Sequence, residues 1–300
     1  MRPKTEFLLT GDVICDLITP LENTSMQYIP YGGGAIANMA RHLGMRDREV
    51  CFLTVFSPDP FGTMLRRELK EHKIDLSLAQ TIAQTETPLC FISNDETGER
   101  YFLHRGGDPY RQYLLPQEPL FTPTYDFFVW GISSLRTPDL RRLVDSTIQN
   151  GDGLTVCDPG SCPEWWGEPN ALKVHLLERL SHIDIFKCSM PEAIWLTGQK
   201  NAEQALEFLH QRGVGVGIIT DGANGLYVRI SNETEHLSVA PCNAVDTTGA
   251  GDATLAGFLN ALDPKVRTAS PQEIKIALKQ GIELARVTVQ HQGAGPWQLS

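Results

Sequence analysis

The sequence lacks the marks of several large classes of protein. No apolar run is long enough to cross a membrane, and the run at residues 7–9 is too short for the hydrophobic region of a signal peptide. Seven cysteines are scattered along the chain without a Cys-x-x-Cys pair, which is typical of reduced thiols and not of a disulfide framework. We therefore expect a cytoplasmic protein without a membrane partner.

Basic residues are fewer than acidic ones, and two common nucleotide-binding loops are absent from the sequence. Lys and Arg number 26 against 36 Asp and Glu, and the net charge of −10 argues against nucleic acid as a partner. No Gly-x-x-x-x-Gly-Lys-Ser/Thr segment occurs, which excludes a P-loop enzyme. Glycines at residues 213–217 precede an expected strand instead of following one, so they do not form a dinucleotide-binding loop.

The residues that are present favour one α/β domain over residues 1–300. Short apolar runs alternate with amphipathic segments, which predicts a mostly parallel sheet covered by helices on both faces. Buried strands are expected at residues 7–9, 50–55, 127–130, 154–157, 183–186 and 216–220. Helices are expected near residues 37–43, 64–72, 138–149, 172–180, 202–212 and 271–290.

Two pairs of short segments interrupt this alternation. Residues 13–18 with 28–31, and 89–93 with 99–104, have the pattern of hairpins, and the second pair is joined by Asn-Asp-Glu-Thr-Gly. We expect these segments, near 13–33 and 88–106, to form a small β-lid outside the main sheet. An exposed lid edge would allow a homodimer to form through the lid.

The most informative segment is residues 249–252, Gly-Ala-Gly-Asp, followed by an apolar run at helical spacing. We expect a loop that opens a helix, where backbone N–H groups without intrahelical partners form a hole for an anion. These groups belong to Gly249, Ala250, Gly251 and Asp252. A carboxylate there makes sense if Asp252 takes a proton from a hydroxyl that attacks a phosphate, as in a kinase for a small alcohol. On these four residues alone, a tight turn with a helix cap is the alternative.

Residues 246–252, together with Ala-Gly-Phe-Leu at 256–259, resemble the C-terminal signature of the ribokinase-like (PfkB) carbohydrate kinases. The resemblance extends over nearly the whole chain, with the motifs in the family's order. It implies a ribokinase-like α/β fold with a β-lid. It also implies transfer of the γ-phosphate of ATP to a sugar hydroxyl, with Asp252 as the catalytic base and Mg²⁺ as the cofactor.

The sugar-binding residues implied by the resemblance lie in the first third of the chain. Residues 33–40 resemble the family's Gly-Gly-x-x-x-Asn motif, which assigns Gly33, Gly34 and Asn38 to the sugar. Two glycines allow a close approach of the backbone, and the Asn38 amide offers both a donor and an acceptor. Asp16 and Arg105 stand where related kinases hold the substrate. Taken alone, these residues would be read as a turn with a helix cap, a solvated carboxylate and a surface arginine.

The nucleotide and magnesium assignments also follow from the resemblance. Residues 187–192 occupy the place of the family's Asn-x-x-Glu motif, with Ser189 in place of the asparagine. Glu192 would act on Mg²⁺ through water, since this ion keeps several of its waters. Thr220, Gly222 and Gly225 fall in a loop after an expected strand, where nucleotide phosphates and ribose sit in similar kinases.

A monovalent-cation site is implied beside the anion hole. Asp246 and Thr248, with carbonyl groups near residues 293–295, stand where related kinases hold such an ion, so the sequence allows K⁺.

The departures from the family concern mainly the substrate. Gly160 and Cys162 stand where fructokinase-like members carry Asn and Arg, Ile36 replaces a small residue or proline, and Ser57 replaces a glycine. Fructose is the first expectation for the acceptor. The alternatives are 2-keto-3-deoxygluconate, a nucleoside or an inositol on the same fold, and, in another class, a sugar sensor without turnover.

Overall fold

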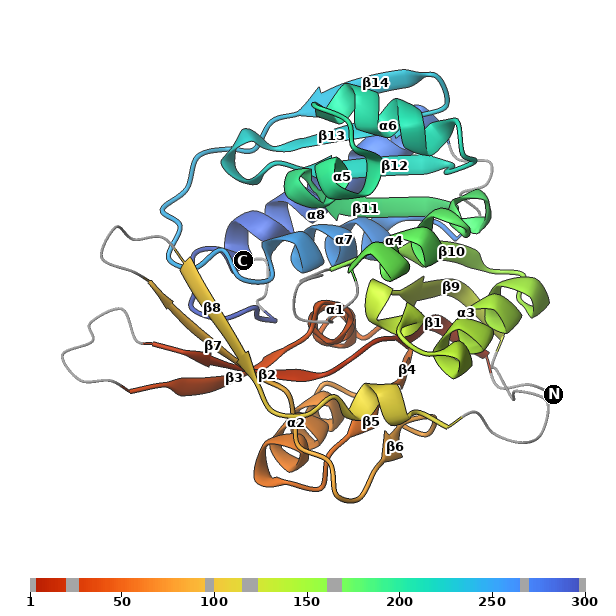
Figure 1. Cartoon of the computed structure of the whole chain (residues 1–300). Helices are drawn as coiled ribbons and strands as arrows, with labels where there is room; N and C mark the ends of the chain where they lie inside the picture. The colour runs from red at the N-terminus through yellow and green to blue at the C-terminus, as the bar shows by residue number, and fades with distance from the viewer. Residues whose placement is uncertain are drawn as a thin grey trace.

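The main sheet has eight strands in the order β14-β13-β12-β11-β10-β9-β1-β4 (Figure 1). The computed structural model describes residues 4–19, 27–94, 100–114, 124–160, 169–264 and 270–296. The strands are β1 (Lys4–Thr10), β4 (Val50–Leu53), β9 (Thr124–Trp130), β10 (Leu154–Cys157), β11 (Ile185–Ser189), β12 (Val216–Thr220), β13 (Leu226–Ile230) and β14 (Glu233–Leu237). The first six pair in parallel, and β13 and β14 add an antiparallel edge.

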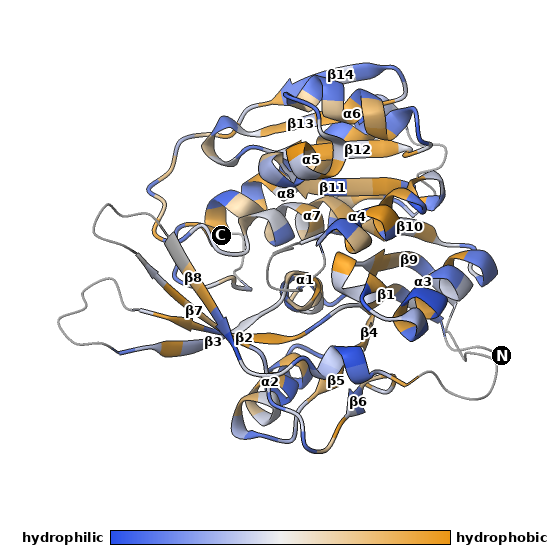
Figure 2. Ribbon diagram, in the orientation of Figure 1, coloured by the Kyte–Doolittle hydropathy of each residue, from blue (hydrophilic) through white to orange (hydrophobic). Residues whose placement is uncertain are grey.

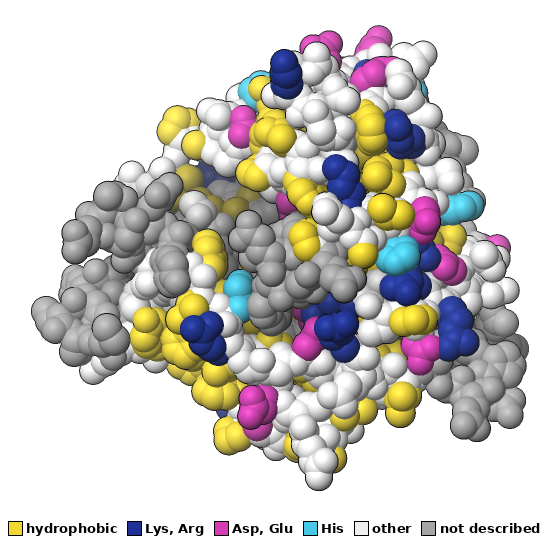
Figure 3. All heavy atoms as spheres, in the orientation of Figure 1, with side chains coloured by type: hydrophobic (Ala, Val, Ile, Leu, Met, Phe, Trp, Pro, Cys, Tyr) yellow, Lys and Arg dark blue, Asp and Glu magenta, His cyan; other side chains and the backbone are white. Residues whose placement is uncertain are grey.

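Alternation along the strands divides the interior into two cores. Phe7 and Leu9 of β1 lie in one core and Leu8 in the other, because successive side chains of a strand point to opposite faces. The first core is shared with α1, α2, α7 and α8, and the second with α3 to α6. Figure 2 shows the apolar character of the central strands between these two helical layers. On the face drawn in Figure 3, Lys and Arg are interspersed with Asp and Glu.

Eight α-helices cover the sheet in the part of the chain that the structure describes. They are α1 (Ala35–Gly44), α2 (Pro60–Glu71), α3 (Pro138–Asn150), α4 (Pro169–Leu177), α5 (Met190–Thr197), α6 (Ala202–His210), α7 (Ala250–Ala261) and α8 (Pro271–Thr288). Several start with side-chain caps, such as Asp59 at α2, Thr137 at α3 and Ser270 at α8, each followed by proline in the first turn. The side-chain oxygen of the cap accepts a hydrogen bond from a free N–H group of the first turn. Proline suits this turn because it has no N–H group that would remain unpaired.

A second sheet of four strands stands outside the main one, in the order β3-β2-β7-β8. Its strands are β2 (Ile14–Ile18), β3 (Ile29–Gly33), β7 (Leu89–Asn94) and β8 (Arg100–Arg105). The two hairpins are antiparallel, and β2 pairs in parallel with β7 between them. In Figure 1 this sheet projects to one side of the helical layers. It corresponds to the lid expected from the sequence, and β3 leads directly into α1.

The sequence missed some elements. The segment expected as one strand over 50–55 is divided at Thr54 into β4 and β5 (Val55–Phe56), and β5 pairs with β6 (Gln80–Thr81). Neither α5 nor the β13–β14 hairpin was expected. The strand expected at 183–186 runs from Ile185 to Ser189. Among the described helices, none combines the length and apolar character that crossing a bilayer requires.

Candidate active site

Among the α-helices whose N-caps the structure describes, two begin without a side-chain cap, and both begin at a predicted site motif. Gly34 precedes α1 with φ 96°, and Gly249 precedes α7 with φ 75°, conformations that favour glycine. The N-termini of α2, α3, α5, α6 and α8 are each capped by a side chain. No side chain caps the first N–H groups of α1 and α7. The Ala250 N–H donates to the Thr247 carbonyl at 3.3 Å, and the other first-turn N–H groups are of the kind that favours an anionic or hydroxylic ligand.

The two motifs meet directly at Asp252. The Asn38 amide donates a 2.8 Å hydrogen bond to Asp252 Oδ2, across 214 residues of sequence. Arg41, one turn further along α1, donates from Nη1 to Asn38 Oδ1 at 2.9 Å, which fixes the orientation of the amide. The buried Arg41 is in turn held by Glu68 of α2, 3.0 Å away. This chain of contacts aligns the predicted base with the Gly-Gly-x-x-x-Asn motif.

The surroundings of Asp252 shift the pKa of its carboxyl. Burial raises the pKa of this carboxyl, while the charge of Lys187 and the hydrogen bond from Asn38 oppose the rise. A base whose pKa lies above the ordinary carboxyl value is a better proton acceptor near neutral pH. Asp252 lies in the first turn of α7, so it borders the uncapped N–H groups.

Glu192 and Ser189 lie at the carboxyl end of β11, where they form a capping box for α5. The Ser189 N–H and hydroxyl donate to Glu192 Oε2 at 2.6 and 2.7 Å. The charge of Glu192 acts on both Asp252 and Lys187. Hence the predicted magnesium residue lies within electrostatic range of the predicted base. In the described ranges, no cluster of three or more His, Cys, Asp or Glu could hold a metal by protein ligands alone.

The predicted nucleotide loop follows the next strand, β12. Thr220 ends the strand and its hydroxyl donates to the Cys188 carbonyl of β11 at 3.4 Å. Gly222 and Gly225 have φ of 54° and 98°. A Cβ at Gly225 would lie 2.2 Å from the Leu237 carbonyl oxygen, whereas one at Gly222 would meet nothing within 4 Å. The loop therefore continues the row of strand ends on which Ser189 lies.

Asp246 joins the anion-hole loop to the C-terminal loop. Its Oδ1 accepts from the Thr248 N–H at 2.7 Å and its Oδ2 from the Gly293 N–H at 2.9 Å. Next to Gly293, Ala294 packs against Gly249: a Cβ built on Gly249 would lie 2.5 Å from the Ala294 Cβ. The two segments predicted to share a monovalent cation are thus in contact.

On the sugar side, Asp16 faces the start of α1. A Cβ at Gly33 would lie 2.4 Å from Asp16 Oδ2, so the glycine makes room for this buried carboxylate. A Cβ at Gly34 would be 2.6 Å from the Asp12 carbonyl oxygen. Arg105, at the end of β8, has an exposed side chain whose Nη1 donates to the His104 carbonyl.

The departures from the family pattern have structural explanations where they are described. Gly160 has φ 52°, and a Cβ there would meet the Ala35 Cβ at 2.6 Å, so the loop after β10 packs closely on the start of α1. Ile36 is buried against Gly11, whose added Cβ would lie 2.9 Å away. Ser57 opens the loop before α2. Cys162 lies outside the described residues.

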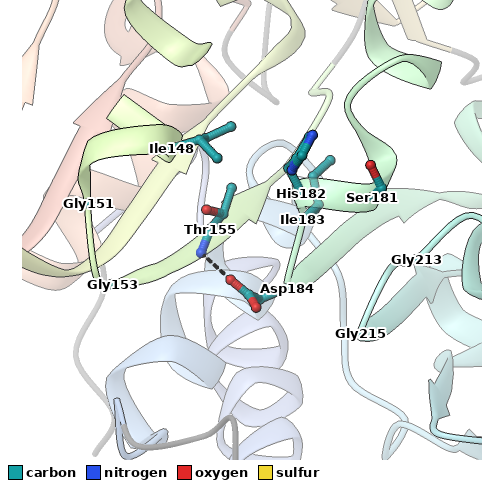
Figure 4. A pocket seen from close by; sticks show the side chains of 10 residues that line it. All are labelled: Ile148, Gly151, Gly153, Thr155, Ser181, His182, Ile183, Asp184, Gly213 and Gly215. Atoms are coloured by element: carbon teal, nitrogen blue, oxygen red, sulfur yellow. Dashed lines mark hydrogen bonds between the residues drawn. The ribbon is translucent and has the colours of Figure 1, made fainter. Parts of the chain in front are cut away.

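A separate pocket of about 270 Å³ lies at the opposite edge of the sheet (Figure 4). It is formed where β10, β11 and β12 begin, with Gly153, Asp184 and Gly215 among its lining residues. Asp184 accepts from the Thr155 N–H at 2.8 Å and so contributes to the local backbone structure. None of the predicted site residues lines this pocket, and the candidate site is therefore at the carboxyl edge.

Lys187, like Arg41, is a charged residue of the site that sequence reasoning missed. Its Nζ lies 2.9 Å from Asp158 Oδ2, and both side chains are buried. The signal was available, because a lysine inside the apolar strand Ile-Phe-Lys-Cys-Ser must have a buried partner.

Comparisons with known proteins agree with this geometry. The chain is 27% identical over 256 residues to a fructokinase of Klebsiella pneumoniae, covering 84% of this chain and 82% of the relative. It is 25% identical to the aminoimidazole riboside kinase of Salmonella typhimurium, over 86% of this chain and 82% of the relative. The fructokinase of Vibrio cholerae, solved with fructose, ADP and calcium, superposes with a TM-score of 0.85 at 24% identity, covering 98% of this chain and 94% of that one.

The family is shown by a match to nearly the whole chain. The sequence pattern of the pfkB family of carbohydrate kinases matches residues 4–299. The mostly parallel sheet between helices, with its outlying β-lid, is thus a ribokinase-like fold, and the expected fold class is confirmed. The chain belongs to the pfkB family of carbohydrate kinases.

Proposed function

We propose that this kinase transfers the γ-phosphate of ATP to a hydroxyl of fructose, with Asp252 as the base. The observation that carries the proposal is the hydrogen bond from Asn38 to Asp252, which joins the two uncapped helix starts at one carboxylate. Gly33, Gly34, Asn38 and Asp16 hold the sugar in this proposal. The N–H groups of residues 249–252 stabilise the charge on the transferring phosphoryl group.

For the nucleotide side, we propose that ATP lies along the ends of β11 and β12. Ser189, Thr220, Gly222 and Gly225 border it there, at the edge where parallel sheets bind such ligands. Mg²⁺ would be bound mainly by phosphate oxygens and water, with Glu192 contacting its waters. The Vibrio cholerae fructokinase was solved with fructose, ADP and a calcium ion bound, which supports a divalent cation in the proposed reaction.

A monovalent cation is proposed between the two loops joined by Asp246. Asp246 and Thr248 lie on one side and the carbonyl groups of residues 293–295 on the other. A double mutant of the Vibrio cholerae fructokinase was solved with potassium, which supports K⁺ as the ion.

The acceptor is best identified by direct assay. ATP consumption should be measured with fructose, 2-keto-3-deoxygluconate, inositol, nucleosides including aminoimidazole riboside, and sugar phosphates. We expect the largest kcat/KM for fructose. A larger value for another acceptor would keep the kinase and change the substrate, whereas sugar binding without turnover of any acceptor would favour the sensor.

Asp16→Ala should raise the KM for the sugar far more than the KM for ATP. The carboxylate would lose charge-assisted hydrogen bonds to hydroxyls, worth about 1–3 kcal/mol when a partner is left unpaired. Steady-state kinetics with each substrate varied separately measures the split. Arg105→Ala tests the other side chain that the resemblance assigns to the substrate, and its effect on the sugar KM should be smaller because its guanidinium is exposed. Equal rises in both KM values would contradict the assignment of Asp16 to the sugar.

We also propose that the lid mediates a homodimer. β3 and β8 are the edge strands of the lid sheet, and each has an exposed apolar side chain, Ile29 and Phe102. Unpaired strand edges with apolar residues invite pairing with a second chain. Phe102→Lys should shift a dimer to monomer in sedimentation velocity, and a protein that is monomeric before the change would refute the proposal.

A further inference from the structure

Lys187 and Asp158 form a buried ion pair at the carboxyl edge of the sheet. Lys187 belongs to β11, and Asp158 directly follows the neighbouring strand β10. Their side chains are 5% and 1% exposed, and Lys187 Nζ lies 2.9 Å from Asp158 Oδ2. Burying two charges costs free energy that replacement by apolar residues would avoid, so stability alone is a poor reason for the pair.

The position of the ammonium group points to the anion hole. A Cβ built on Gly251 would lie 2.6 Å from Lys187 Nζ and 3.3 Å from its Cε. Gly251 is in the first turn of α7, immediately before Asp252. The lysine therefore lies against the backbone whose N–H groups are left uncapped, and the absence of a side chain at Gly251 gives it room.

The charges around Lys187 keep it positive. Burial acts against the charged form, but Asp158, Asp252 and Glu192 together raise the pKa of Lys187 above its ordinary value. In turn Lys187 lowers the pKa of Asp252, as does Arg41 of α1, whereas burial and Glu192 of α5 raise it. A permanent positive charge is thus placed beside both the base and the helix start.

We propose that Lys187 is a positioning residue for phosphoryl transfer: held by Asp158 beneath Gly251, its ammonium group places a fixed positive charge behind the anion hole and beside Asp252. This inference rests on the proposed kinase function. Groups that are preorganised toward developing negative charge stabilise a transition state without rearranging during the reaction. The positive charge would stabilise the transition state of phosphoryl transfer more than it stabilises the complex with bound ATP.

Lys187→Met tests the inference, since methionine keeps most of the length and removes the charge. We expect kcat to fall about 10²–10³-fold, the range typical of a lost preorganised donor. ATP and sugar affinities should stay within a few-fold. The acidic limb of the pH profile of kcat/KM should move to higher pH, because Asp252 would lose the cation that favours its ionised form.

A second variant separates this role from a structural one. Lys187→Met with Asp158→Asn removes both charges of the pair, so no unpaired charge remains at position 158 and the fold should be recovered as judged by thermal unfolding. We expect the double variant to remain slow. Recovery of kcat to within about threefold of wild type would overturn the inference, because the pair would then serve only the fold.

Binding of a phosphoryl-transfer mimic gives a readout that does not depend on turnover. We expect the double variant to bind Mg²⁺–ADP normally but to bind Mg²⁺–ADP with aluminium fluoride at least about tenfold more weakly than wild type. Equal loss of both complexes would contradict the inference. A wild-type protein that phosphorylates no acceptor would refute the proposed function itself. If the wild type is active, an active double variant or an equal loss of both complexes would refute the lysine's role alone.

Discussion

Asp252→Asn should abolish phosphoryl transfer while leaving the site assembled. The asparagine oxygen can still accept from the Asn38 amide, which lies 2.8 Å from Asp252 Oδ2 in the native protein. It cannot accept the substrate's proton, and loss of a general base typically costs about 10²–10⁴ in rate. We expect sugar and ATP affinities within a few-fold of wild type, measured by calorimetry alongside kcat.

Asn38→Ala is the informative companion to that variant. It removes the hydrogen bond to Asp252 but leaves the carboxylate, so kcat should fall by less than in Asp252→Asn. If Asp252→Asn keeps more than about a tenth of the wild-type kcat, Asp252 is not the base, and its hydrogen bond with Asn38 does not position a base.

Much of this site could be predicted from sequence because its parts are local. Residues 249–252 combine glycines with an acidic residue before an apolar helix, so the loop, the helix and the base could be predicted together. Gly34 and Asn38 were assigned through the resemblance to the family, because alone they would be read as a turn with a helix cap. The structure adds that α1 packs on α7, which brings Asn38 into contact with Asp252. No short-range pattern specifies that packing.

Two of the missed elements, β14 and α5, lack the apolar periodicity on which prediction depends, whereas β13, with the sequence Leu-Tyr-Val-Arg-Ile, alternates as a strand should and could have been predicted. β14 is an exposed edge strand, and its residues give no apolar run. The helix α5 spans only eight residues and begins with Met-Pro, so its start resembles a turn. Lys187 was missed for a different reason: its partner Asp158 is distant in sequence and meets it only because β10 and β11 are neighbours.

The position of Gly249 also depends on a distant segment. The residue has φ 75°, which alone predicts that glycine is preferred. The structure shows a second constraint, since an added Cβ would lie 2.5 Å from the Cβ and 2.8 Å from the Cα of Ala294. Ala294 is buried, and its carbonyl contacts His42 Nε2 at 3.1 Å, so it has little freedom to move.

Gly249→Ala should therefore damage catalysis beyond its cost in backbone strain. Gly198 offers a matched control, because it has φ 70° at the end of α5 but nothing lies within 4 Å of an added Cβ. Alanine in the left-handed conformation costs about 1–2 kcal/mol, so the free energy of unfolding should fall by at least that amount in both variants. Only Gly249→Ala must displace Ala294, and with it the loop that Asp246 binds through Gly293.

The expected result is a kcat for Gly249→Ala at least about tenfold below that of Gly198→Ala, because displaced N–H groups no longer stabilise the transferring charge. Denaturant unfolding of both variants measures how far the strain lowers the free energy of unfolding. The catalytic effect is measured as kcat at saturating ATP and sugar. Gly198→Ala should retain nearly full turnover. If the two variants turn over equally, contact with Ala294 does not position the anion hole, and the φ of Gly249 is the only constraint on that residue.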